Sequence, residues 1–149
     1  MRTILTGVAA AAVFAFSANA QVLTFDGIAT GGSQTPVGDF YDGGSGSANN
    51  FGITFFANAL ALNPAAGNCG GSGNFARQPS GCGALFFLTG GSIGMNRTAG
   101  FTTGFSLFYS AVSQPASLQV SSGLNGTGSV LAALLLPVTP QAGGPACDG

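Results

Sequence analysis

FTTGFSLFYSAV, the stretch from Phe101 to Val112, decides how the rest of this chain is interpreted. One set of alternate positions consists of Phe101, Thr103, Phe105, Leu107, Tyr109 and Ala111, and the smaller residues Thr102, Gly104, Ser106 and Ser110 lie between them. An alternation with a period of two is typical of a β-strand that has one apolar face. Because this is also the longest run of aromatic and β-favouring residues, we expect it to form the central strand of a sheet.

Shorter apolar runs on both sides of this stretch predict further strands. They are Val22 to Phe25, Gly52 to Asn58 with Ala59 to Leu62 as an extension, Ala84 to Thr89, Ser92 to Asn96, Ser117 to Ser121 and Val130 to Leu136. Between the last two, GLNGTG at Gly123 to Gly128 is typical of a hairpin turn. The polar stretch Ile28 to Asn50 predicts a long loop. Short strands joined by Gly-rich turns, without a helical period, predict an all-β fold: an antiparallel β-sandwich, jelly-roll-like.

The first 20 residues differ in character from the rest. A cationic start at Arg2 precedes an apolar stretch from Ile4 to Phe16 and a small-residue end at Ala20. This order is typical of a secretory signal, and the apolar stretch is shorter than the roughly 20 residues that a membrane span needs. We therefore expect residues 1–20 to be a signal peptide and residues 21–149 to be a single domain without a transmembrane segment.

The residue inventory excludes several classes of function. The formal net charge is −1 and charged residues make up 5% of the chain, so no basic surface for nucleic acid is expected. Histidine, lysine, glutamate and tryptophan are absent, which removes histidine-based nucleophiles, lysine Schiff bases and histidine metal sites. GGSIG at Gly90 to Gly94 matches the G-x-S-x-G pattern of hydrolases, but no histidine can activate Ser92, so we interpret it as a turn. We expect no enzyme and no catalytic residue.

Three aspartates, Asp26, Asp39 and Asp42, carry most of the remaining polar chemistry. Their carboxylates, with the amide oxygen of Asn49, are hard ligands of the kind that calcium prefers. One hypothesis is therefore a weak calcium site at the three aspartates, and the alternative is that they form turns and keep the chain soluble. A carboxylate pair for glycoside hydrolysis is less favoured, because Gly-rich loops rarely hold two carboxylates at a fixed separation.

Aromatic side chains offer a second kind of binding surface. Tyr41, with Phe40, Phe51 and Tyr109, could stack against the apolar faces of sugar rings, although such residues more often belong to a core. The candidate ligand-binding residues are Asp26, Asp39, Tyr41, Asp42 and Asn49.

The three cysteines are Cys69, Cys82 and Cys147. The segment between the first two, rich in Gly, Ser and Asn, has no apolar pattern to hold it folded. A disulfide between Cys69 and Cys82 is the economical interpretation in an exported protein, and two buried free thiols are the alternative. This disulfide would stabilise the fold by about 3 kcal/mol on the chain-entropy model. The partner of Cys147 stays open.

Val130 to Leu136 is the most apolar run after the signal, and PVTPQAGGPACDG follows it. As a final edge strand it would be open to other chains unless a further strand covered it. We therefore expect the domain to lack its last strands and self-association to be possible.

Five motifs together suggest a family. They are LTFDG at Leu23 to Gly27, VGDFYDGG at Val37 to Gly44, NNFGITF at Asn49 to Phe55, GFTTGFSLFYSA at Gly100 to Ala111 and SGLNGTGSVLA at Ser122 to Ala132. In these motifs the chain resembles exported bacterial proteins of the PEP-CTERM class. It departs from that class in lacking a closing FDN-like motif and the Pro-Glu-Pro motif, helix and basic tail used for sorting.

The resemblance implies a secreted β-sandwich protein, extracellular or on the cell surface of a bacterium, associated with exopolysaccharide or biofilm matrix. Our leading expectation is a non-catalytic extracellular matrix or surface protein with exopolysaccharide as its candidate partner. A self-associating structural protein is the alternative, and an aspartate-based glycosidase is the third.

Overall fold

A computed structural model of the chain describes residues 20–28, 34–47, 49–62, 83–101, 104–111 and 113–139. Its strands are β1 (Gln34–Pro36), β2 (Ile53–Phe55), β3 (Leu60–Leu62), β4 (Ala84–Phe86), β5 (Met95–Arg97), β6 (Ala116–Ser121) and β7 (Val130–Leu136), with one 3₁₀ turn, η2 (Leu124–Gly126). Because this part of the chain contains no α-helix, the prediction of an all-β protein is confirmed. None of its segments is a helix long and apolar enough to cross a membrane.

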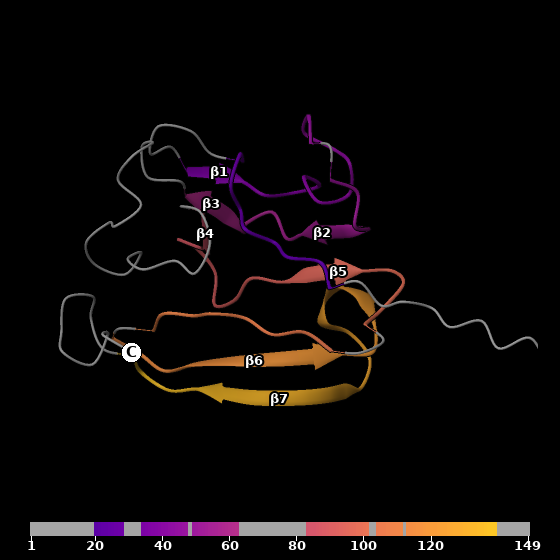
Figure 1. Ribbon diagram of the computed structural model, residues 1–149. Coiled ribbons are helices and arrows are strands. Elements are labelled where there is room, and N and C mark those ends of the chain that lie inside the picture. The colour runs from indigo at the N-terminus through magenta and orange to yellow at the C-terminus, as the bar shows by residue number, and fades with distance from the viewer. Residues whose placement is uncertain are drawn as a thin grey trace, which may run out of the picture.

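The strands pair antiparallel in three small sheets rather than in one. The first has the order β1-β3-β4, the second pairs β2 with β5, and the third pairs β6 with β7 (Figure 1). The antiparallel pairing agrees with the sequence prediction. The sheets do not close on one another, so the jelly-roll arrangement stays a prediction.

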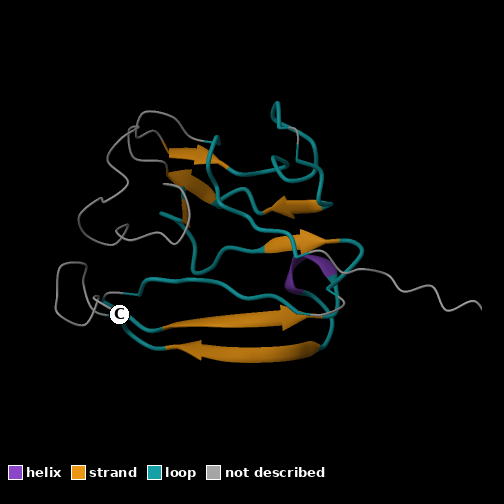
Figure 2. Cartoon of the chain, viewed as in Figure 1, coloured by secondary structure: helices purple, strands orange, loops and turns teal. Residues whose placement is uncertain are grey.

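The central strand predicted at Phe101 to Val112 is wrong for the described residues. Residues 104–111 form an extended segment outside any strand (Figure 2). Its backbone bonds to the chain after β7 at one place, where the N–H of Thr139 donates to the Ala111 carbonyl at 3.0 Å. Because its side chains line one groove with those of β6 and β7, the segment lies over the face of the β6–β7 hairpin instead of pairing along an edge.

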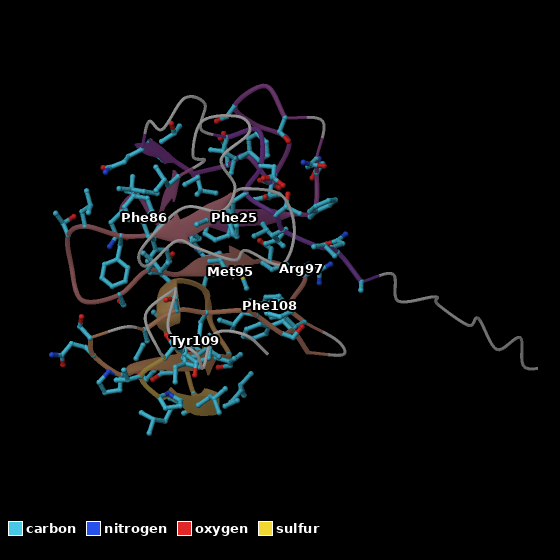
Figure 3. All side chains as sticks on the ribbon, turned by 60° about the vertical axis from the view of Figure 1, so that its left-hand side comes forward. Phe25, Phe86, Met95, Arg97, Phe108 and Tyr109 are labelled. Carbon is cyan, nitrogen blue, oxygen red and sulfur yellow. The ribbon has the colours of Figure 1, made fainter. Side chains whose placement is uncertain are left out.

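The predicted alternation of side chains is nevertheless present in this segment. Phe105, Leu107 and Tyr109 line a groove shared with β6 and β7, whereas Phe108 is 83% exposed (Figure 3). A period of two reports which side chains share a face of an extended chain. It does not supply the hydrogen-bonded neighbour that makes a strand.

The strand predicted at Val22 to Phe25 is also wrong. This segment is irregular, and Phe25 has a φ of 59°, outside the β region. The turn predicted at Asp26 and Gly27 is present, with Gly27 at a φ of 80°. Phe25 is thereby turned into the core instead of extending a sheet.

The remaining strand predictions hold in part. The long loop predicted at Ile28 to Asn50 contains β1, and the run Gly52 to Leu62 is divided by a turn into β2 and β3. Strand β4 is shorter than predicted because the chain after Phe86 turns outward, leaving Phe87 and Leu88 exposed. Strand β5 begins and ends one to three residues later than predicted.

An aromatic core lies among β1 to β5, which we call the body. Val37, Tyr41, Ile53 and Ala61 are buried together. The Tyr41 ring meets four phenylalanine rings at centroid distances of 5.1 to 6.2 Å: Phe25, Phe40, Phe51 and Phe55. Edge-to-face and stacked pairs at such distances stabilise a core beyond the area they bury.

The hairpin of β6 and β7 matches its prediction closely. Its register runs from Ala116 opposite Leu136 to Val120 opposite Ala132, with an irregularity after Val120. In the turn, Asn125 has a φ of 58°, a conformation that Asn tolerates better than most residues. The local turn chemistry of GLNGTG is therefore sufficient to specify this element.

Candidate functional site

Asp26 links two segments that are far apart in the sequence. Its Oδ1 accepts a hydrogen bond at 2.8 Å from the N–H of Gly83, just before β4. A Cβ at position 83 would lie 2.4 Å from the carbonyl carbon of Phe25 and from the carbonyl oxygen of Thr24. Because such contacts exclude any side chain, this approach requires glycine. The LTFDG motif therefore contributes to the fold through this contact with Gly83.

Asp39 and Asp42 lie in one tight loop. The hydroxyl of Ser45 donates to Oδ1 of Asp39 at 2.7 Å, and the N–H groups of Asp42 and Gly44 donate to the Asp39 carbonyl. Asp42 is exposed and forms a β-bridge with Asn50, which closes the loop. These contacts indicate that both aspartates stabilise the conformation of this loop.

The three aspartates are not gathered into one site. Within the ranges that the structure describes, no group of three or more Asp, Glu, His or Cys side chains is placed to hold a metal ion. The calcium site stays a hypothesis that titration has to test.

Tyr41, a candidate for sugar stacking, is 2% exposed. Its hydroxyl accepts a hydrogen bond at 2.8 Å from the N–H of Phe25, and burial raises the pKa of this hydroxyl. Since phenylalanine rings surround it, the Tyr41 ring serves the core and has no open face for a ligand. Asn49 is half-buried, and its N–H donates to the hydroxyl of Ser47 at 2.9 Å.

Ser92 lies in an irregular loop that leads into β5, not in a strand-to-helix turn. The amide nitrogen of Asn58 donates to the carbonyls of Thr89 and Ser92, at 2.9 and 2.8 Å, and so holds the loop against the body. The G-x-S-x-G pattern therefore occurs here without the backbone geometry of a hydrolase nucleophile.

An apolar groove lies between the segment 104–111 and the inner face of the hairpin. It encloses about 590 Å³, a size typical of ligand-binding sites. Its lining includes Phe101, Phe105, Leu107 and Tyr109 on one side and Leu118, Val120, Ala132 and Leu134 on the other. No charged side chain lines it. Sequence reasoning singled out Tyr109 in this groove, and the period of two placed Phe105 and Leu107 on the same face.

The hairpin itself is apolar and leaves several large side chains of β7 exposed. Leu131 and Leu135 project from the outer face and are 65% and 69% exposed. Leu134 lines the groove on the inner face, Val130 pairs with Ser121 at the start of the strand, and each is more than half exposed. Strand β7 pairs only with β6 in the described part of the chain, so its other edge faces outward.

A pair of asparagines joins the body to the hairpin. The amide nitrogen of Asn96 in β5 donates to Oδ1 of Asn125 at 2.7 Å, and the backbone N–H of Asn125 donates to Oδ1 of Asn96 at 2.8 Å. Both contacts are exposed to solvent, so each contributes modestly. The pair nevertheless sets where the tip of the hairpin meets β5 (Figure 1).

Two predictions lie outside the described residues. Cys69, Cys82 and Cys147 fall there, and so do residues 1–19 of the predicted signal peptide. The disulfide and the signal therefore stay predictions. Comparison with protein-family models, with curated proteins and with solved structures found no match to this chain.

Proposed function

We propose that this protein is a non-catalytic structural protein of the bacterial cell exterior that works by self-association. The observation that carries the proposal is the open hairpin, in which Leu131, Leu134 and Leu135 are all more than half exposed. Contiguous apolar surface of this kind marks association sites on soluble proteins. Because only 5% of the residues are charged, little electrostatic repulsion opposes contact between copies.

The absence of catalytic function belongs to the same proposal. The sequence supplies no histidine, lysine or glutamate, and the structure engages Asp26 and Asp39 in hydrogen bonds within the fold. Export is proposed from the signal-like residues 1–20, and the PEP-CTERM-like motifs support a place outside the cell. The resemblance itself rests on those motifs alone.

A sandwich of jelly-roll type is the finer fold that we propose. The segment 104–111 lies over the hairpin face, with Phe105 and Tyr109 toward Leu118 and Leu134. Two apolar layers that face each other in this way are the beginning of a sandwich core. A further strand beside β7 would extend one of those layers.

Sedimentation of the chain from Gln21 onward tests the proposal. The weight-average mass should rise with protein concentration in a buffer that contains no polysaccharide. A monomer mass over the whole range from micromolar to hundreds of micromolar would refute self-association.

Binding of extracellular polysaccharide is the second candidate function. Its support is the row of Phe101, Phe105 and Tyr109, whose rings are partly exposed along the groove. Sugar rings stack on such aromatics, but their hydroxyls also need polar partners, which the groove lining mostly lacks. We therefore rank it second.

A pull-down on purified exopolysaccharide separates the two functions. Retention that soluble glycan competes away, and that Tyr109→Ala with Phe105→Ala abolishes, supports polysaccharide binding. Retention that is absent while the sedimenting mass still rises with concentration supports self-association alone.

A further inference from the structure

We infer that the partner of β7 is β7 of a second copy, so that two hairpins join into one four-stranded antiparallel sheet. The inference rests on the proposed self-association and names its interface. It is carried by the backbone of β7, by the order of its side chains and by the charges around it.

The backbone of β7 offers an open edge. In an antiparallel pair, every second residue points both its N–H and its C=O away from the partner strand. Within the described residues β7 pairs with β6 alone, so these outward groups have no strand beside them. A second extended strand is the partner that satisfies them all at once.

Strand β7 lacks most of the features with which proteins block such edges. Those features are charged residues, proline and bulges. VLAALLL, the sequence of β7, contains no charge, no proline and no glycine. The one irregularity of β7 lies at its start, where Val120 pairs with Ala132 and Ser121 with Val130, so that Leu131 is an extra residue. Pro137 comes only after the strand ends, and the edge is therefore regular from Ala132 to Leu136.

The order of side chains in β7 fits pairing with itself. With a two-fold axis at Ala133, an antiparallel copy places Leu131 opposite Leu135 on the outer face. On the inner face, Ala132 comes opposite Leu134 of the second copy. Directly opposed side chains in a sheet have Cβ atoms about 4.5–5.5 Å apart, which is within contact distance for leucines. The two most exposed leucines of β7 thus cover each other.

Charge does not oppose the approach of two hairpins. Residues 104–139 contain no Asp, Glu, Lys or Arg. The charged residues of the described part lie in the body and before it: Asp26, Asp39, Asp42 and Arg97. A two-fold interface of this kind is also closed, because the same edge is used on both copies. A dimer, not an open fibre, is the expected product.

Two charge-changed chains test the interface and its register. One carries Leu131→Asp with Leu135→Asp, and the other carries Leu131→Lys with Leu135→Lys. Because position 131 of one copy opposes position 135 of the other, each chain alone brings like charges together twice. We expect a dissociation constant at least about tenfold higher for each chain alone, and recovery of a dimer when the two are mixed in equal amounts.

Controls separate the interface from folding and from general charge effects. Circular dichroism and thermal melting at low concentration should match the parent for both chains, because leucines 131 and 135 are exposed. Leu88→Lys changes another exposed leucine, outside the hairpin, and should associate as the parent does.

Hydrogen exchange distinguishes edge pairing from stacking of the outer faces. Edge pairing should slow exchange in the peptide that spans residues 130–136 as protein concentration rises. Face stacking would leave the outward N–H groups of β7 in contact with water, and their exchange unchanged.

The outcomes are distinct for the two proposals. A parent chain that stays monomeric refutes the proposed function and with it this interface. A parent that associates, with charge-changed chains that associate equally well alone or fail to combine in the mixture, overturns β7 pairing and leaves the proposed function standing. Unchanged exchange in residues 130–136 of an associating parent also overturns it.

Discussion

In the body, four phenylalanine rings close around Tyr41, whereas in the hairpin three leucines of β7 lie more than half exposed. Both regions are rich in apolar residues, so composition does not separate them. What separates them is the origin of their contacts. The body is assembled from segments far apart in sequence, and the hairpin from one turn. Substitutions in the body should therefore change stability, and substitutions in the hairpin should change association.

Gly83→Ala should produce the largest loss of stability. The added methyl group meets backbone atoms of Thr24 and Phe25 at 2.4 Å, and neither can rotate away. We expect a loss of about 3 kcal/mol in the free energy of unfolding, measured by chemical denaturation. Gly91→Ala is the matched control, because nothing lies within 4 Å of a Cβ there. Equal effects at the two positions would show that the close approach at Gly83 has no energetic weight.

Tyr41→Phe should have a smaller and pH-dependent effect. At neutral pH it removes the hydroxyl that accepts from Phe25, for a loss of about 1 kcal/mol. Burial raises the pKa of Tyr41 above its ordinary value of 10.0, so the folded state resists ionisation. This pKa difference stabilises the folded state fully below pH 10. The stabilisation is lost as the pH rises from 10 through the raised pKa.

Denaturation curves at neutral pH and above pH 10 check this prediction. The parent should lose stability over the alkaline range, and Tyr41→Phe should lose less over the same range. If both chains lose the same free energy of unfolding over the alkaline range, ionisation of the Tyr41 hydroxyl does not destabilise the folded state.

The hydrogen bonds between Asn96 and Asn125, which join the two regions, should contribute less to stability than the core of the body. Asn96→Ala removes both hydrogen bonds to Asn125, and we expect a loss of about 1 kcal/mol. Faster hydrogen exchange around residues 95–97 and 124–126 would report the loosened contact. Gln119→Ala is the control, since Gln119 bonds to Ser121 within the hairpin. If exchange at β5 responds equally to both variants, the asparagine pair does not join the regions.

Leu135→Lys should leave the unfolding free energy of the dilute chain within about 0.5 kcal/mol of the parent, as is usual for exposed positions. The concentration dependence of the sedimenting mass should nevertheless weaken. A large loss of stability in the dilute chain would show that the outer face of β7 is covered within one copy.

Calcium should have the smallest effect. If Asp26, Asp39 and Asp42 bind calcium with a dissociation constant on the order of millimolar, about 1 mM calcium should stabilise the body by about 0.4 kcal/mol. Melting with and without calcium, in the parent and in Asp39→Asn, measures this. A shift of several kcal/mol that survives Asp39→Asn would contradict placing the site at this loop.

Sequence reasoning succeeded where structure is specified locally. The GLNGTG turn and β7 lie where predicted, because glycine and asparagine at a tight turn require few distant contacts. Strands β4 and β5 were located from their apolar runs, but their ends differ from the prediction because they pair with the distant strands β3 and β2. The sequence pattern also predicted correctly that Phe105, Leu107 and Tyr109 share a face.

It failed where a distant partner decides the outcome. The alternation at Phe101 to Val112 could not reveal that the segment lies over a hairpin face, since alternation carries no information about a neighbouring strand. Tyr41 stands in a polar stretch, and the sequence left its role open between a core residue and a ligand-binding residue, because its burial depends on rings from Phe25 and Phe55. The bond between Asp26 and Gly83 leaves no local signal at either residue.

The same bond orders the events of folding. Asp26 and Gly83 are 57 positions apart, so closing that loop costs chain entropy before the body gains its contacts. The hairpin needs only its turn, and isolated hairpins form in about 1–10 μs. A refolding chain therefore exposes the edge of β7 before the aromatic rings of the body are buried. Encounters between half-folded chains compete with loop closure, and the yield of correctly folded protein should fall as the refolding concentration rises.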